Sequence, residues 1–156
     1  MTTILGIDPG QTSGWCIYDT DARRAVASGQ FENADLPYIE QLFDIVVIER
    51  PTGYFGSPPA MVECGIVFGM LHERLDQAHE VESLKRHDVK RILSDATHRE
   101  ILVKNDATAW AALKLLHGGE ASAKKGGPLH GVKAHERAAL AVAVAWGLRQ
   151  VSPAPT

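Results

Sequence analysis

Cysteine is scarce in this sequence, and its placement argues against two classes of small protein. The 156 residues include 2 cysteines, Cys16 and Cys64, and both lie among apolar neighbours. Neither their number nor their spacing matches a zinc site or a disulfide-stapled secreted domain. We therefore interpret both as buried free thiols, as is typical of proteins in the reducing cytosol.

Long hydrophobic runs are also missing. The longest apolar stretch, residues 138–148, is rich in alanine and shorter than the roughly 20 residues that a membrane-spanning helix needs. The first residues, Met-Thr-Thr, contain no basic segment or apolar core of a secretion signal. With 45% hydrophobic residues, the chain instead suits one domain with its own core. We expect this domain to span residues 1–150 and residues 151–156 to form a disordered tail.

The sequence lacks a net positive charge, but its average conceals an asymmetry. The formal net charge is −3. Residues 1–80 contain 4 Lys or Arg and 12 Asp or Glu, whereas residues 81–156 contain 12 and 7. The basic second half could therefore face a polyanion while the first half stays acidic. Ordinary surface charge explains the same numbers, so sequence motifs must decide whether the basic half binds a polyanion.

Five short segments have the composition of β-strands. Residues 3–7, 14–18 and 24–31 follow one another closely enough to form an antiparallel meander. The β-branched run at residues 45–48 predicts an interior strand, and residues 81–84 predict a weaker one. Because helical segments separate the later strands, the order indicates an α/β fold with an antiparallel start and a parallel continuation.

Helical patterns occupy most of the remaining chain. Ser57 is expected to cap one helix and Asp106 another, while residues 118–127 look like a flexible basic linker. Gly65 and Gly69, four residues apart, permit another element to approach one helix closely. Helices are expected at residues 37–43, 58–75, 88–93, 107–116 and 135–148, the last of them apolar nearly all round and hence buried.

Two of the expected strands end on a carboxylate. Asp8 follows one apolar run and Glu49 follows another. Carboxylates meeting at one sheet edge repel each other and lose hydration, and Mg²⁺ or Mn²⁺ relieves both penalties. Either residue alone is equally consistent with a solvated strand end, but the pair favours a metal site. His135, at the start of the last helix, is a third candidate ligand or else a helix cap.

Three motifs together carry a family resemblance. The stretches ILGIDPGQTSGW, VVIERP and HERAALAVAVA, in this order and spacing, resemble the RuvC-type Holliday junction resolvases of the RNase H-like superfamily. The stretch PLHGVKAHERAALAVAV is more similar to the phage and prophage branch, whereas residues 81–125 match only loosely. The resemblance implies an α/β, RNase H-like fold, with a mixed five-stranded sheet of three antiparallel and then parallel strands flanked by helices.

The resemblance also implies a catalytic site. Asp8, Glu49 and His135 match positions that hold two Mg²⁺ or Mn²⁺ ions per site, with Asp8 bridging both ions, Glu49 near the attacking water and His135 on the other side. The family often has a further aspartate three residues after the position of His135, where this chain has Ala138. Three explanations stay open: natural variation, an inactivating engineered substitution, or a substitute ligand, for which Glu136 and Asp106 are the candidates.

The implied activity is paired, metal-dependent cleavage of a four-way DNA junction by a cytoplasmic homodimer, in DNA recombination and repair of a bacterium or a phage-infected cell. The helix at residues 58–75 is the expected dimer interface. Two readings compete with junction resolution: a nuclease for flaps and other branched DNA, and a catalytically impaired junction-binding protein. An actin-like or sugar-kinase ATPase is disfavoured by the short chain and by the absence of a Gly-x-x-x-x-Gly-Lys-Ser/Thr motif.

DNA contacts are expected from aromatic and basic residues. Two neighbouring aromatic residues in a glycine-flanked loop suit stacking on unpaired bases, and scattered lysines and arginines suit the phosphate backbone. The candidates are Tyr54, Phe55, Lys85, Arg86, Lys90, Arg91, Arg99, Lys104, Lys124, Lys125 and Lys133.

Overall fold

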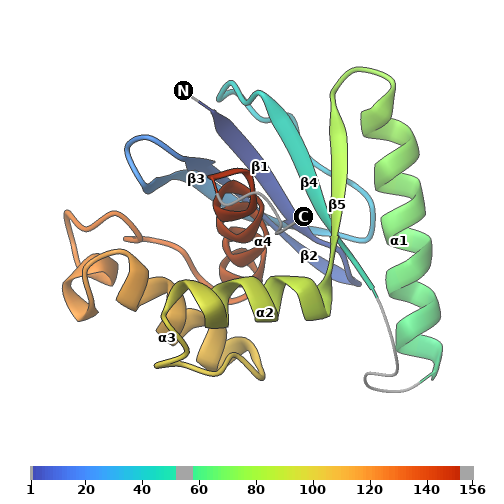
Figure 1. The fold of residues 1–156 in the computed structure, drawn as a ribbon. Helices are drawn as coiled ribbons and strands as arrows, with labels where there is room; N and C mark the ends of the chain where they lie inside the picture. The colour runs from blue at the N-terminus through green and yellow to red at the C-terminus, as the bar shows by residue number, and fades with distance from the viewer. Residues whose placement is uncertain (1, 52–57, 152–156) are drawn as a thin grey trace.

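The computed structural model describes residues 2–51 and 58–151. Within these residues the chain forms five strands, four α-helices and one short 3-10 helix (Figure 1). In order, they are β1 (Thr3–Asp8), β2 (Thr12–Asp19), β3 (Arg24–Glu32), β4 (Ile45–Arg50), α1 (Pro58–Asp76), β5 (Val81–Lys85), α2 (Arg86–Ala96), α3 (Asp106–Leu116), η1 (Glu120–Ala123) and α4 (Ala134–Val151).

The five strands form one mixed sheet in the order β3-β2-β1-β4-β5. β1 pairs antiparallel with β2, and β2 with β3, so the first three strands are the predicted meander. β4 joins β1 in parallel, and β5 joins β4 in parallel. The structure therefore confirms the predicted sheet of three antiparallel strands followed by parallel ones.

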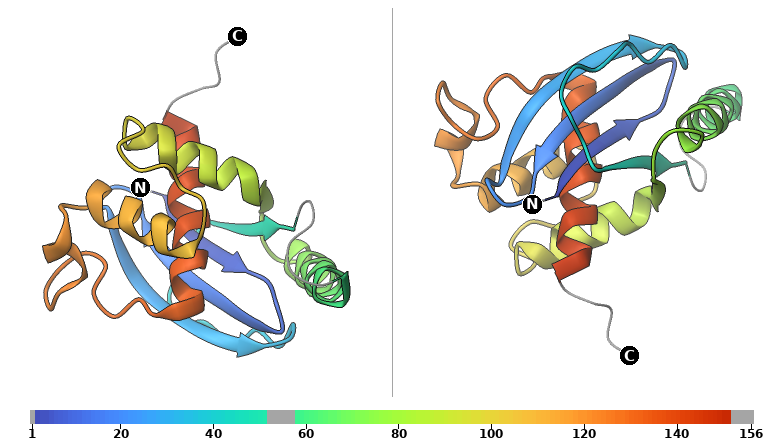
Figure 2. Two further views of the ribbon diagram at one scale, coloured as in Figure 1. Left: turned by 90° about the horizontal axis from the view of Figure 1, so that it is seen from below. Right: turned by 90° about the horizontal axis from the view of Figure 1, so that it is seen from above.

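Each strand divides its side chains between two apolar layers. In β1, Ile4 belongs to a core cluster with α2, α3 and α4, whereas Leu5 and Ile7 belong to a cluster with α1. The alternation follows from the two-residue period of a strand. Figure 2 shows the consequence, with α4 across one face of the sheet and α1 on the other side. Full burial of a Leu or Ile side chain contributes roughly 1.5–3 kcal/mol, so both layers stabilise the sheet.

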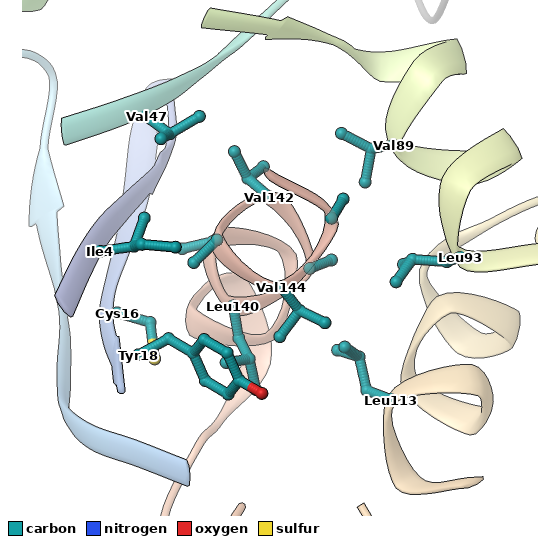
Figure 3. Packing of buried hydrophobic residues seen from close by; sticks show 14 of the residues in the cluster. Ile4, Cys16, Tyr18, Val47, Val89, Leu93, Leu113, Leu140, Val142 and Val144 are labelled. Carbon is teal, nitrogen blue, oxygen red and sulfur yellow. The ribbon is translucent and has the colours of Figure 1, made fainter. Parts of the chain in front are cut away.

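α4 is the central helix of the larger layer. Figure 3 shows it between the sheet and helices α2 and α3, where Leu140 and Val144 approach Tyr18 of β2 and Leu113 of α3. Residues 139–145 of α4 are all buried. This agrees with its sequence, which is apolar nearly all round and therefore predicts a helix with neighbours on every side.

Two glycines allow α4 to lie directly on the sheet. A Cβ atom at Gly6 of β1 would stand 2.2 Å from the carbonyl oxygen of Ala139, and one at Gly14 of β2 would stand 2.1 Å from that of His135. Real Cβ atoms do not approach oxygen so closely, so these positions require the absence of a side chain. The first turns of α4 are consequently held against β1 and β2.

Replacing Gly6 by alanine is expected to destabilise the fold. The added methyl group must displace the backbone of α4, and overpacking of this kind typically costs about 1–3 kcal/mol. Urea unfolding followed by circular dichroism measures the change. The matched control is Gly147→Ala in α4, where the added Cβ would meet only side-chain atoms of Thr20 and Ile4, at 3.3 and 3.5 Å. Because alanine is the better helix former and those side-chain atoms can shift, the control should lose no stability. Equal stability of Gly6→Ala and the wild type would contradict this packing argument.

The helix expected at residues 37–43 does not form. Its Tyr38 and Leu42 are 91% and 90% exposed, so a helix here would bury too little apolar surface to offset its nucleation cost. The segment is held in another way, because the carboxylate of Asp44 accepts hydrogen bonds from the backbone N–H and the hydroxyl of Thr3, at 2.7 and 2.9 Å.

The expected cap of α3 was also wrong by one residue. Asn105 forms the cap. Its side-chain oxygen accepts a hydrogen bond from the backbone N–H of Thr108 at 2.9 Å, and its backbone N–H donates one to the Thr108 hydroxyl at 3.0 Å. This reciprocal pair occupies the capping role, so the carboxylate of Asp106 points to another partner. The cap expected at Ser57 lies outside the described residues. The region expected as a flexible linker, residues 118–127, includes the helical turn η1.

Both cysteines are free, as expected. Cys16 is buried between the sheet and α4, whereas Cys64 on α1 is half-buried, because the buried stripe of α1 is Val67, Leu71 and Leu75. Among the described residues, no helix is both long enough and apolar enough to span a bilayer.

Candidate active site

The two acidic strand ends lie side by side. β1 and β4 are parallel neighbours whose register pairs Ile7 with Ile48, so the residues that follow, Asp8 and Glu49, lie at adjacent strand ends. Because side chains alternate, both carboxylates point to the face of the sheet that α4 covers. Asp8 is half-buried and Glu49 is buried, so neither carboxylate is fully hydrated.

Burial raises the pKa of both carboxylates, and nearby negative charge adds to the rise. The pKa of Asp8 is raised chiefly by burial. The pKa of Glu49 is raised first by burial and next by the negative charge of Asp8. Each shift indicates that a nearby positive charge would be stabilising. The pair therefore has the electrostatic character of a site that is completed by a cation.

One cationic side chain already reaches this pair. Nη1 of Arg86 lies 3.3 Å from Oε1 of Glu49, and Nη2 lies 3.4 Å from Oδ1 of Asp106. The local sequence explains the placement, because β5 pairs Leu84 with Glu49 and Arg86 begins α2 two residues later. Arg86 lowers the pKa of Asp8 and of Glu49, partly offsetting the effect of burial.

A small cavity of about 30 Å³ adjoins Glu49. This is room for about two water molecules. Arg86, Asp106 and Ala138 of α4 also line it. Position 138, where the family resemblance implies an aspartate, thus lines the same cavity as Glu49 but contributes a methyl group. The remaining lining residues are Val89, Lys90, Val103, Asn105, Ala109, Arg137 and Ala141.

His135 and Glu136, in the first turn of α4, have different surroundings. The backbone of His135 packs on Gly14, which is the cross-strand partner of Asp8, and its imidazole is exposed. His135 and Ala138 are three residues apart and share a helix face. Glu136 lies about 100° further round the helix. Its carboxylate accepts hydrogen bonds from Ser28 at 2.5 Å and from the Gln30 side chain at 3.4 Å, both on β3.

The two candidates for a substitute ligand therefore differ. Glu136 is buried and hydrogen-bonded to β3, away from the acidic pair. Asp106 lies close enough to raise the pKa of both Asp8 and Glu49 by its negative charge. Of the two, only Asp106 is positioned to act in the same site.

The donor set fits one Mg²⁺ or Mn²⁺ ion. Within residues 2–51 and 58–151, no three His, Cys, Asp or Glu side chains are grouped so that they alone could hold a metal ion. Mg²⁺ is, however, usually bound through one or two carboxylates together with water and substrate phosphates. Asp8 and Glu49 supply the two carboxylates, and their raised pKa values favour a cation between them.

The expected DNA-binding residues lie on several elements. Arg86 and Lys90, in the first turns of α2, line the cavity beside Glu49, and Lys85 is the last residue of β5. Lys124 and Lys125 directly follow η1. The segment that contains η1 lies far from α1 in Figures 1 and 2. Lys133 precedes α4 and is exposed, as is Arg91 on α2, which pairs with Asp88. Tyr54 and Phe55 lie outside the described residues.

Comparison with known proteins gives a match in structure. No protein-family model matches the chain, and no curated protein matches its sequence. The structure is similar to that of Thermus thermophilus RuvC, with a TM-score of 0.66 and 14% sequence identity over 96% of this chain and 95% of that chain. It is also similar to T. thermophilus RuvC in complex with a Holliday junction substrate, with a TM-score of 0.62 and 13% identity over 97% and 96% of the two chains.

The chain has a RuvC-like fold. The match spans nearly the full length of both chains, and together with the strand order it confirms the predicted RNase H-like fold class. At this level of identity the likeness concerns the fold, so the activity must be argued from the residues at the site. The similarity to the phage and prophage branch stays a prediction.

Two features of this RuvC-like fold were not predicted from the sequence. Arg86 was expected only as a phosphate contact, yet it bridges Glu49 and Asp106. The sequence signal that could have predicted this contact is the position of Arg86 just after β5, which is the neighbour of β4 in the sheet. Cys64 of α1 lies near the same edge: burial and the negative charge of Asp8 raise the pKa of its thiol, which keeps it protonated.

Proposed function

We propose that this protein is a metal-dependent endodeoxyribonuclease that acts on branched DNA and resolves four-way junctions. The observation that carries the proposal is the pair of desolvated carboxylates, Asp8 and Glu49, at the adjacent ends of β1 and β4 in a RuvC-like fold. A solved structure of similar fold is T. thermophilus RuvC in complex with a Holliday junction substrate, which supports the choice of substrate.

In this proposal the chain's own residues position the reaction. Asp8 and Glu49 would hold Mg²⁺ or Mn²⁺, and their rigid strands fix where it binds. When bound, such an ion activates water and stabilises the leaving 3′ oxygen of a phosphodiester. His135, on the first turn of α4, has an exposed imidazole that would orient the incoming phosphate or accept a proton. Arg86 adds a permanent positive charge beside the acidic pair.

The surroundings of the acidic pair suit a nucleic-acid backbone. Lys85 and Lys90 flank Arg86, and Lys90 lowers the pKa of Glu49 through its positive charge. Although the chain is acidic on average, these cations would meet the scissile phosphate in the proposed complex. Local positive charge of this kind supports phosphate binding with a strong dependence on salt.

Cleavage of both strands of a junction calls for two active sites, and α1 offers an interface for a homodimer. Its exposed face carries Val62, Ile66 and Met70, which are 62%, 57% and 55% exposed. Gly65 and Gly69 lie between them, and a Cβ at either would meet nothing within 4 Å in the single chain. An apolar face with small residues suits close, isologous packing of two copies of α1.

The test is a cleavage panel. Purified protein is incubated with four-way, three-way, flap and linear duplex DNA in Mg²⁺ and in Mn²⁺, and nicks are mapped on sequencing gels. We expect symmetrically placed nicks in the four-way junction and none in linear duplex. Preferential cleavage of flaps would favour the alternative of a general branched-DNA nuclease. Tight binding of the four-way junction without nicking in either metal would favour the alternative that Ala138 suggests, a catalytically impaired junction-binding protein.

A further inference from the structure

The guanidinium of Arg86 contacts two acidic side chains at the candidate site. The two terminal nitrogens of Arg86 form ion pairs with different carboxylates. Nη1 lies 3.3 Å from the carboxylate of Glu49, and Nη2 lies 3.4 Å from that of Asp106. A planar guanidinium is suited to such paired contacts and stays charged at all working pH values. The arginine thus lies between two acidic side chains of the candidate site.

The side of the site next to α4 has room for a cation but lacks a ligand. The cavity of about 30 Å³ between Glu49, Arg86, Asp106 and Ala138 holds no carboxylate from α4, because position 138 is alanine. A second divalent cation placed there would lack that oxygen ligand and would be repelled by the adjacent guanidinium.

Asp8 and Glu49 alone are a sufficient protein ligand set for one ion. Mg²⁺ is commonly held by one or two carboxylates, with water and substrate phosphate oxygens completing its coordination. Two ions would require more carboxylate oxygens than these two residues supply without strain. Asp106, which is the nearest additional acid, is already engaged by Arg86.

We propose that Arg86, anchored by Asp106, takes the place of a second divalent cation, so that each chain binds one ion at Asp8 and Glu49. The inference rests on the proposed function, because it concerns the number of ions in the same site. In this arrangement the guanidinium stabilises the negative charge that develops on the phosphate, as preorganised cationic groups do in phosphoryl transfer. Asp106 acts as a positioning residue that fixes the guanidinium.

The number of bound ions is the direct test. Mn²⁺ is titrated into the full-length protein, and electron paramagnetic resonance of the free ion measures the number bound per chain. We expect one Mn²⁺ per wild-type chain and loss of this binding in Asp8→Asn. Arg86→Gln is expected to raise the number from one to two, because it removes the repelling charge and releases Glu49 and Asp106. Circular dichroism verifies that each variant is folded.

Two further variants separate the role of Arg86 from that of position 138. Ala138→Asp restores a carboxylate but leaves the guanidinium in place, so it is expected still to bind one ion. Arg91→Gln removes another ion-paired arginine of the same helix and should leave the number at one. A rise to two ions in Ala138→Asp alone would show that the missing carboxylate, and not Arg86, sets the number, and would overturn the proposal.

The outcomes also separate this inference from the proposed function. Two ions bound per wild-type chain, together with junction nicking, would overturn the one-ion proposal and leave the nuclease intact. No bound ion and no nicking of any branched DNA would overturn both.

Discussion

Asp8→Asn is expected to reduce the rate of junction nicking at least about 10³-fold, as removal of a group that stabilises the transition state does. Asparagine has the shape of aspartate but no negative charge, so it cannot hold a divalent cation beside Glu49. Junction binding should persist, because the cationic residues around the site are unchanged. Single-turnover cleavage measures the first effect and a gel-shift titration in Ca²⁺ measures the second.

The same substitution should not unfold the protein. The raised pKa of Asp8 means that its ionised form is disfavoured in the folded state, so a neutral amide is expected to keep or increase the melting temperature. The matched control is Asp19→Asn at the end of β2. Asp19 pairs with Thr3, at the opposite end of the sheet from Asp8, and its side chain accepts from the backbone of a turn. Full activity of Asp8→Asn, or equal loss in Asp19→Asn, would contradict the assigned site.

Ile66→Glu is expected to dissociate the dimer and to convert paired cleavage into single nicks. Ile66 is 57% exposed at the middle of the apolar face of α1. In an isologous interface each substitution counts twice, so losing about 1.5–3 kcal/mol of burial per side weakens association by roughly two to four orders of magnitude. Light scattering measures the mass of the particle, and a cruciform plasmid distinguishes nicked from linear product.

The control for this variant is Leu115→Glu, which places the same charge at an exposed apolar position of another helix. Leu115 is 42% exposed on α3, away from α1. It is expected to leave the dimer intact. A monomeric wild type, or dissociation caused by both substitutions, would show that α1 is not the interface.

Much of the fold follows from local sequence patterns. The short apolar runs of β1 and β4 predict strands, because β-branched and alternating residues suit a pleated, buried surface. The apolar composition of α4 around its whole circumference predicts a central helix, and the structure places it between the sheet and two helices. The segment at residues 37–43 does not form the predicted helix: Ile39 and Phe43 pack against the core, whereas Tyr38 and Leu42 are exposed.

The candidate site was predictable in part for the same reason. Asp8 and Glu49 stand out because a carboxylate directly after a buried strand is unusual, and parallel pairing of β1 with β4 then brings them together. The partners of the other polar residues were not predicted from the sequence. Whether Asp106 caps a helix or joins the site depends on Asn105 and Thr108, which form the cap instead.

What the sequence determined by itself is the order of the five strands, the burial of α4 and the acidic ends of two strands, because these depend on periodicity and on composition within a few residues. The tertiary structure alone decided that Arg86 bridges Glu49 and Asp106, that Glu136 bonds to β3, and that Ala138 faces a small cavity. These contacts join segments distant in the chain, and their geometry depends on helix rotation and on close packing against glycine.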